Sequence, residues 1–480
     1  MLAELAAAVR SRRVSAVELV TAALERIERL NPALNAVTEL RAERALREAR
    51  ALDERGAEGP LAGLPLLVKD NTDVAGMVTT FGSRTMLDRP PAGAHEITVE
   101  RMVEAGAVIV GRTNIPEFAF QGWTDNDLHG PTRNPWGLEW SPGGSSGGSG
   151  AALAAGMAPI ATGTDGGGSI RTPAAFCGLV GLKPTAGLIG RRPIPSWLET
   201  STQGPLARTV ADARLLLEVM RGPVEGDPSA APRWESRGGM TSRVIAVART
   251  RDYGPIPPEV DRPFRAALDA IDAELGLPVE ELTPAELFPT TGATSGMSRD
   301  DWYVTVTVEE LHFLGRTWVR RHLDEFSDPF RREMEHALGY TLEEYLTARH
   351  RRFGYTADLD RLLGEDAVLV CPTHGYEGWL ADGTLPGTDR VAAGEGYNTG
   401  EFNLSGHPSL SVPAGTSSNG LPFGLEITGP RWRDDLVLEF GAAWERVRPW
   451  TGTAPGCEPF SLDGLSADHG LDGISAGHGA

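Results

Sequence analysis

Two short apolar runs separated by a helical pattern constrain the fold more than any other feature of this sequence. Residues 63–70 (GLPLLVKD) and residues 107–114 (AVIVGRTN) each have the length and apolar content of a buried strand. Residues 95–106, which lie between them, have the pattern of a helix. Strands that alternate with helices predict an α/β fold with a mixed, mostly parallel sheet.

The rest of the chain continues in the same way. Residues 2–60 are expected to be helical, because Ser15 and Glu18 form a capping box and Asn31-Pro32 marks a helix end. Other expected elements are helices at 202–220, 258–275 and 300–360, strands at 243–248, 366–371 and 409–412, and a surface loop at 221–242. The tail after Pro459 is short of large apolar residues, which predicts loose packing.

The composition argues against several classes of protein. A net charge of −20 disfavours a nucleic-acid partner, because binding to phosphate backbones is driven by Lys and Arg. Three scattered cysteines, Cys177, Cys371 and Cys457, favour a reducing cytoplasm over a disulfide framework. No apolar run is long enough to span a membrane, and no HExxH or CxxC pattern indicates a metal. We therefore expect a cytoplasmic enzyme that needs no metal or cofactor.

Lysine is nearly absent from the chain. Of 45 basic residues, only Lys69 and Lys183 are lysine, a bias that genomic base composition explains. A desolvated lysine can lose its proton, whereas an arginine effectively cannot, so the two lysines are candidates for proton chemistry. Lys69 ends an apolar strand, where desolvation would lower its pKa. Lys183, in GLKPT, has no serine cluster beside it, and a structural role is favoured for it.

Two Gly/Ser segments have the most unusual local sequence, residues 141–150 (SPGGSSGGSG) and residues 163–174 (GTDGGGSIRTPA). A flexible linker is disfavoured, because apolar sequence follows the first segment directly. A phosphate loop would need GxxxxGK[ST], which is absent, and no convincing Asp…His order supports an α/β-hydrolase site. Neither segment therefore fits these common alternatives.

Amide hydrolysis needs the residue types that these segments contain. A hydroxyl must be made nucleophilic by a base, and backbone amides must point at the developing oxyanion. The run Gly166-Gly167-Gly168-Ser169 offers a hydroxyl and unobstructed amides. The base need not be histidine, because Ser–Lys variants of the triad exist, and Lys69 is the candidate.

The same segments resemble the amidase signature family. The resemblance rests on GGSSGGS, GTDGGGSIRTPAAFCGLVGLKPT and GLPLLVKD, and extends through GRTNIPEFAF, PTRNPW, GPLARTVADA, NLSGHPSLSVPAG and GLPFGLEITGP. It covers most of residues 10–220 and 366–445. It implies one large α/β/α amidase domain over residues 1–460 and a loose tail at 461–480. Within the domain it implies a signature core at about 60–220, a variable substrate-side helical region at about 222–365 and a return to the sheet at about 366–445.

The resemblance also implies roles for individual residues. Ser169 corresponds to the nucleophile, Ser145 to a bridging serine that follows a cis peptide bond, and Lys69 to the base. The oxyanion amides map to Gly166, Gly167, Gly168 and Ser169. Ser146 would form hydrogen bonds around Ser145, Asp165 and Arg171 would brace the loop, and Phe120, Gln121, Gly122 and Trp123 would approach the acyl side of the pocket.

Two parts of the sequence depart from the family pattern. The family more often has a β-branched residue at position 166, and Gly166 would either loosen the oxyanion loop or widen the pocket. Residues 222–365 match no pattern of the family. Within them, residues 300–360 are rich in aromatic side chains, for which a helical core or cover is favoured over a substrate lid.

The predicted function is hydrolysis of a linear carboxylic amide, or of a related anilide or carbamate, through a Ser-cisSer-Lys triad and an acyl-enzyme. The expected partner is a small-molecule amide, and a homodimer is left open. One alternative is the glutamine-hydrolysing component of a tRNA-dependent amidotransferase, which would liberate ammonia from glutamine for a partner. The other is a non-catalytic, amidase-like scaffold, which is disfavoured because every catalytic position is filled.

Overall fold

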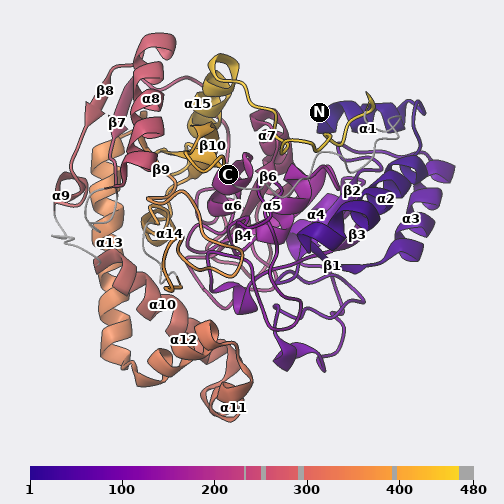
Figure 1. Cartoon of the computed structure of the whole chain (residues 1–480), viewed down its shortest axis with the longest axis horizontal. Coiled ribbons are helices and arrows are strands. Elements are labelled where there is room, and N and C mark those ends of the chain that lie inside the picture. The colour runs from indigo at the N-terminus through magenta and orange to yellow at the C-terminus, as the bar shows by residue number, and fades with distance from the viewer. Residues whose placement is uncertain (232–233, 250–255, 290–296, 392–396, 464–480) are drawn as a thin grey trace.

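One sheet runs through the molecule and organises the helices around it (Figure 1). The structure, a computed structural model, describes residues 1–463 except 232–233, 250–255, 290–296 and 392–396. The strands are β1 Val37–Leu40, β2 Pro65–Lys69, β3 Val108–Thr113, β4 Ile160–Asp165, β5 Val180–Lys183, β6 Thr202–Ala207, β7 Arg243–Ala246, β8 Val279–Glu281, β9 Ala367–Pro372, β10 Ser409–Thr416 and β11 Pro422–Thr428. They form an 11-stranded sheet in the order β1-β3-β2-β4-β6-β5-β10-β11-β9-β7-β8.

The helices lie along the whole length of this sheet. They are α1 Leu2–Arg10, α2 Ala16–Leu34, α3 Ala42–Arg55, α4 Ile97–Glu104, α5 Gly147–Ala154, α6 Arg171–Cys177, α7 Val210–Met220, α8 Pro258–Leu275, α9 Pro284–Leu287, α10 Met297–Leu314, α11 Arg316–His322, α12 Asp328–Gly339, α13 Leu342–Leu363, α14 Gly400–Ser405 and α15 Asp434–Val447. Short 3₁₀ turns occur at Arg84–Met86, Glu117–Ala119 and Leu323–Glu325. The α/β class predicted from the sequence is confirmed.

The sheet is mixed, but antiparallel pairs are more numerous than the sequence predicted. β2 pairs in parallel with β3 and β4, and β7 pairs in parallel with β8 and β9. All other neighbours are antiparallel, including β10 with β11 and β4 with β6. The prediction of a mostly parallel sheet was therefore wrong. One reason is that β10 and β11 are joined by a short connection, which allows only an antiparallel pair.

Three predicted elements need correction. Residues 2–60 are not helical throughout, because β1 pairs with β3 between α2 and α3. The helix predicted to end at Asn31-Pro32 continues to Leu34 and ends with Asn35 in the left-handed conformation, at φ 50°. The helix predicted over 202–220 is a strand, β6, followed by α7. Gly204 and Pro205 concealed this strand, because both residues are rare in strand interiors.

Other predicted elements are confirmed. The capping box of Ser15 and Glu18 begins α2, α8 covers residues 258–275, and the predicted strands correspond to β2, β3, β7, β9 and β10. The tail is less loose than expected at its start, because Phe460 is fully buried and the Arg26 guanidinium lies over its ring at 5.1 Å. Residues 464–480 lie outside the described part of the chain.

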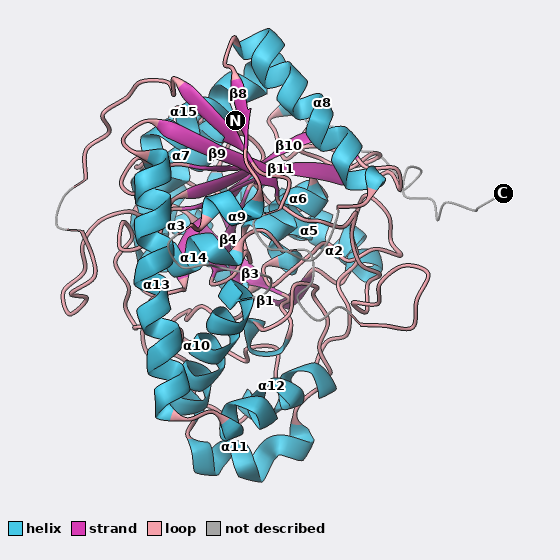
Figure 2. Cartoon of the chain, turned by 90° about the vertical axis from the view of Figure 1, so that its left-hand side faces the viewer, coloured by secondary structure: helices cyan, strands magenta, loops and turns pink. Residues whose placement is uncertain are grey.

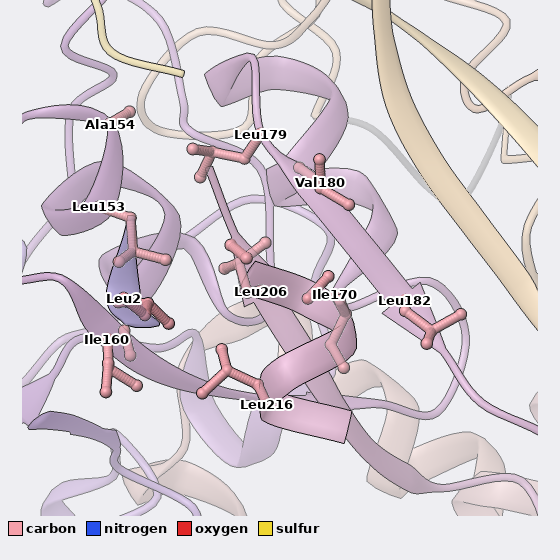
Figure 3. Close-up of a cluster of buried hydrophobic side chains, with 14 of the residues drawn as sticks. Leu2, Leu153, Ala154, Ile160, Ile170, Leu179, Val180, Leu182, Leu206 and Leu216 are labelled. Atoms are coloured by element: carbon pink, nitrogen blue, oxygen red, sulfur yellow. The ribbon is translucent and has the colours of Figure 1, made fainter. Parts of the chain in front are cut away.

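The main core lies where helices pack on the central strands (Figure 3). Side chains from several elements meet there, including Leu153 of α5, Ile160 of β4, Leu182 of β5, Leu206 of β6 and Leu216 of α7. Each of these is at most 1% exposed. This packing fixes β2 and β4 against α5, and so fixes the edge of the sheet from which the candidate catalytic residues project.

The helical segment 297–363 forms a separate group beyond the sheet. α10, α11 and α12 lie at the bottom of both views, and α13 runs beside α10 back towards β9 (Figures 1 and 2). The aromatic side chains Phe326 and Phe330 and several others form a second core here. Of the helices that are described, none is both long enough and apolar enough to traverse a bilayer.

Candidate active site

Two neighbouring strands bring the candidate catalytic residues together. β2 ends at Lys69, β4 ends at Asp165, and the two strands pair in parallel. The carboxyl ends of parallel strands meet at one edge of a sheet, so Lys69 lies beside Thr164 and the glycine loop after β4. Ser145 lies just before α5 and Ser169 just before α6, and both helices pack on the sheet.

Lys69 is enclosed by protein, with 0% of its surface exposed. Its Nζ donates hydrogen bonds to Ser145 Oγ at 2.7 Å and to Thr164 Oγ1 at 2.8 Å. Burial lowers the pKa of the Lys69 ammonium well below its ordinary value, and the Asp165 carboxylate opposes only part of this shift. The amine can therefore be neutral near neutral pH, and a neutral amine can accept a proton.

Ser145 and Ser169 line one cavity beside this amine. The peptide bond between Gly144 and Ser145 is cis, as the resemblance implied, and Ser146 N donates to Ser169 O at 3.2 Å. The Ser146 hydroxyl does not contact Ser145 but exchanges hydrogen bonds of 3.4 Å with the backbone of Thr164. Among the described contacts, none joins the two hydroxyls directly; in free enzymes such contacts often tighten only with substrate.

The glycine loop presents three of the four predicted oxyanion amides. Gly168 is the exception, because its N–H donates to Asp165 Oδ1 at 2.8 Å and so is already engaged. No acceptor among the described residues engages the amides of Gly166, Gly167 or Ser169. Gly168 has φ of 125°, which a residue with a side chain rarely adopts, so glycine is required there.

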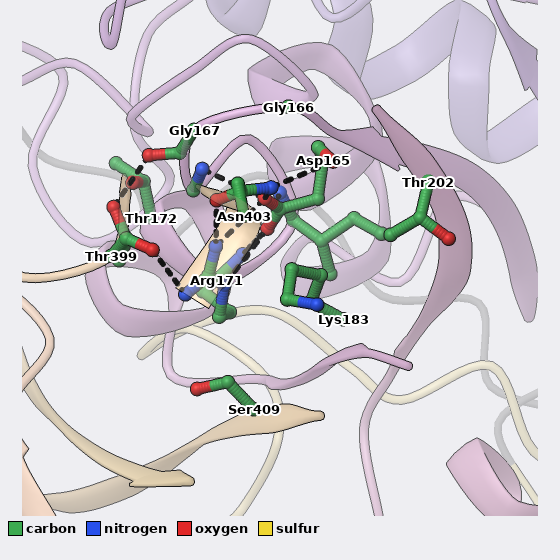
Figure 4. Close-up of polar contacts among 12 residues, drawn as sticks. Asp165, Gly166, Gly167, Arg171, Thr172, Lys183, Thr202, Thr399, Asn403 and Ser409 are labelled. Atoms are coloured by element: carbon green, nitrogen blue, oxygen red, sulfur yellow. Dashed lines mark hydrogen bonds and ion pairs between the residues drawn. The ribbon is translucent and has the colours of Figure 1, made fainter. Parts of the chain in front are cut away.

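A buried ion network holds this loop, as predicted for Asp165 and Arg171 (Figure 4). Asp165 accepts from the amides of Ile170 and Arg171 and from the Arg171 guanidinium, at 2.8–3.4 Å. Arg171 also donates to Glu426 Oε1 at 2.5 Å and to Asn403 Oδ1 at 2.6 Å. Although burial opposes it, the Arg171 guanidinium holds the pKa of Asp165 well below its usual range.

Ser169 lies between two hollows. One is a narrow cleft of about 40 Å³, lined by the predicted Phe120, Gln121, Gly122 and Trp123 together with Trp197, Trp302, Tyr303 and Tyr397. Every residue that lines it is uncharged. The other is a cavity of about 290 Å³ lined by apolar residues such as Phe81 and Ile194 and by charged ones such as Asp73, Arg89 and Arg191. Ser145 lines the cavity but not the cleft.

Gly166 neither loosens the loop nor widens the cleft. A Cβ atom at this position would lie 2.3 Å from a ring carbon of Trp197, so the Trp197 indole occupies the space that a side chain at 166 would take. Trp302 Nε1 donates to Gly166 O at 2.6 Å, and a Cβ at Gly167 would lie 2.6 Å from the Trp302 ring. The two glycines therefore accommodate two tryptophans.

Several site residues were not found in the sequence. Trp197 lies in a loop without a motif, and Trp302 and Tyr303 lie on α10, in the region that matches no family pattern. The aromatic richness of residues 300–360 was the available signal. It was interpreted as core or cover, but α10 also lines the site. Asn403, which donates to the main-chain oxygen and carboxylate of Asp165, was missed as well.

Lys183 does not line either hollow. Its Nζ donates to Pro184 O at 2.9 Å, and burial lowers its pKa to about 7. Its pKa shift resembles that of Lys69, but it contacts neither serine. Within the described ranges, no three His, Cys, Asp or Glu side chains gather in an arrangement that could hold a metal ion.

Comparison with known proteins identifies the family. The Amidase family model matches residues 18–438. An acylamidase of Rhodococcus erythropolis is 35% identical, covering 94% of this chain and 96% of its own. The A-type polypeptide of the glutamyl-tRNA(Gln) amidotransferase of Methylococcus capsulatus is also 35% identical, covering 95% and 98%.

Solved structures agree with this. A bacterial aryl acylamidase of the amidase signature family superposes with a TM-score of 0.84 at 29% identity, over 94% of this chain and 96% of that one. The substrate complex of a 6-aminohexanoate cyclic dimer hydrolase gives a TM-score of 0.82 at 31% identity, over 95% and 98%. The protein therefore belongs to the amidase signature family and is an amidohydrolase.

Proposed function

We propose that Ser169 is the nucleophile of this amidohydrolase, that Ser145 relays its proton and that Lys69 is the base. One observation carries the proposal. A fully buried amine with a lowered pKa lies 2.7 Å from the Ser145 hydroxyl, in the cavity wall where Ser169 and unengaged amides also lie. This combination provides a base, a relay and an oxyanion site.

The reaction divides into two balanced steps. Ser169 Oγ bonds to the carbonyl carbon while its proton passes through Ser145 to Lys69, and the amides of Gly166, Gly167 and Ser169 bind the oxyanion. The C–N bond then breaks as the proton returns through Ser145 to the departing nitrogen. Water enters, gives a proton to the same relay and cleaves the acyl-enzyme, which releases the acid and restores the Ser169 hydroxyl.

The two hollows give the substrate an orientation. Because the departing nitrogen takes its proton from Ser145, the amine half lies in the cavity of about 290 Å³ that Ser145 lines. The acyl half then lies in the cleft beside Phe120 and Trp123, where the family resemblance also placed it. The cleft volume of about 40 Å³ holds on the order of three water molecules, which suits a short acyl group. We therefore propose linear amides with a short acyl group and a larger amine.

Glutamine hydrolysis for a tRNA-dependent amidotransferase is the second candidate, because relatives with that name are 35% identical over nearly the whole chain. Glutamine would place its charged amino and carboxylate groups on the acyl side of the scissile bond. The cleft assigned to the acyl group is small and has no charged residue in its lining. An acylamidase activity, as named for the relative in Rhodococcus erythropolis, is therefore the favoured function.

A substrate screen with two serine variants tests the proposal. The panel contains acetanilide, longer aliphatic anilides, a phenyl carbamate and glutamine. Wild type should hydrolyse acetanilide faster than glutamine, and Ser169→Ala should lose about 10³-fold or more, the order expected when a serine hydrolase loses its nucleophile. The control is Ser149→Ala, a buried serine that bonds Thr113 and Thr162 instead of the site. Near-wild-type activity in Ser169→Ala contradicts the mechanism, and a preference for glutamine supports the alternative.

A further inference from the structure

Three residues line both hollows, namely Ala119, Ser169 and Trp197. Only Trp197 has a side chain large enough to divide one space from the other. It is 7% exposed, and its indole lies against the glycine loop at Gly166. The cleft of about 40 Å³ and the cavity of about 290 Å³ are thus separated next to the nucleophile by a single side chain.

We propose that Trp197 is a specificity-determining partition that limits the size of the acyl group, and that Glu310 is the residue that positions it. The proposal rests on the assignment of Ser169 as nucleophile. It concerns which amides are accepted, and it adds Trp197 and Glu310 to the residues that determine the reaction.

Aromatic contacts hold the Trp197 indole edge-on between two other rings. Its ring centroid lies 4.9 Å from that of Phe120 and 5.6 Å from that of Trp302, with interplanar angles of 80° and 89°. Edge-to-face contacts of this kind fix ring orientation as well as position. Because Gly166 has no side chain, the indole can also approach the loop more closely than it could beside a β-branched residue.

Glu310 fixes the polar edge of the same indole from α10. Trp197 Nε1 donates to Glu310 Oε2 at 2.9 Å, and the hydroxyl of the preceding Ser196 donates to the same oxygen at 2.7 Å. Glu310 is 3% exposed, so these hydrogen bonds are shielded from competing water. Without its acceptor, the indole N–H would be buried without a partner and the ring would lose its fixed position.

The consequence is a test of size selectivity. Removal of the indole joins the cleft to the cavity, so a bulky acyl group gains space that wild type denies it. A short acyl group gains nothing. The informative quantity is therefore the ratio of kcat/KM for benzanilide to kcat/KM for acetanilide, because a general loss of folding or of catalysis lowers both values and leaves the ratio unchanged.

We would measure this ratio for wild type, Trp197→Ala, Trp197→Phe, Glu310→Leu and Glu310→Gln, with circular dichroism as the check of folding. The ratio should rise by about tenfold or more in Trp197→Ala and Glu310→Leu, the discrimination that pocket contacts commonly give. It should stay close to wild type in Glu310→Gln, which keeps a hydrogen-bond acceptor, and in Trp197→Phe, which keeps an aromatic ring.

The variants separate the possible failures. An unchanged ratio in a folded Trp197→Ala overturns the partition, and if that variant does not fold, an unchanged ratio in Glu310→Leu does so. An equal fall for both substrates in Glu310→Leu overturns the positioning role. Activity retained in Ser169→Ala would instead overturn the proposed function, independently of these ratios.

Discussion

At the scale of single residues, the two lysines show why burial alone does not make a base. Burial lowers the pKa of both Lys69 and Lys183. Only Lys69 contacts a serine hydroxyl, and only Lys69 lies at the end of a strand beside the glycine loop. Lys183 donates to a backbone oxygen instead. What distinguishes them is the neighbouring hydroxyl.

Replacing each lysine should therefore have different effects. Lys69→Arg keeps the charge but cannot accept a proton, so kcat for acetanilide should fall by about 10²–10⁴-fold, the usual contribution of a general base. Lys183→Met, the matched control, should change kcat/KM little and affect mainly the unfolding free energy. Substantial activity in a folded Lys69→Arg would rule out the proton role.

The pH profile gives a second test at this scale. Because burial lowers the pKa of Lys69, the neutral amine persists well below the ordinary lysine value of about 10.4. Activity should be highest above the shifted pKa and fall as pH decreases through it, since the ammonium cannot accept a proton. The profile of kcat/KM against pH measures the midpoint. A midpoint near the ordinary lysine value would show that Lys69 is not desolvated in the working enzyme.

At the scale of elements, the loop between β4 and α6 is held by charge rather than by apolar packing. Arg171 bridges Asp165 at the end of β4 and Glu426 in β11, and all three side chains are fully buried. Such a network contributes little net free energy when it is complete, but the loss of one member leaves unpaired buried charges. The network therefore determines the position of the oxyanion amides.

Arg171→Met should accordingly lower the free energy of unfolding by about 3–5 kcal/mol, measured by urea denaturation. The control is Arg243→Met, whose partner Glu280 lies at 2.7 Å in an exposed pair, and which should cost about 1 kcal/mol or less. Equal losses in the two variants would mean that the buried network does not hold the loop.

The sequence was most informative where chemistry and local structure coincide. Lys69, Ser145 and Ser169 were found because they lie in unusual local sequence, and β2 and β3 because their apolar runs are uninterrupted. β6 was missed because Gly204 and Pro205 mask it. Trp197 and Trp302 could not be found, because only tertiary packing brings them to Gly166.

At the scale of the whole molecule, the two ends of the chain are joined to one sheet. β5 from the first half pairs with β10 from the second, and the N-terminal amine lies 3.4 Å from Asp212. Phe460 packs under Arg26. These contacts support the predicted single domain over residues 1–460, which stays a prediction, as does a homodimer.

A single domain should unfold as one unit. Tryptophan fluorescence reports mainly on the site and the helical segment 297–363, and far-UV circular dichroism reports on the whole chain. The two thermal transitions should coincide. An earlier transition seen by fluorescence alone would show that the helical segment is an independent unit.

The most direct test of the account is labelling with a fluorophosphonate followed by peptide mapping. The account predicts that loss of amide hydrolysis follows the modification of Ser169 in a one-to-one ratio, and that labelling is much slower in Lys69→Arg. Complete inactivation with Ser169 unmodified, or an unchanged labelling rate in that variant, would contradict it.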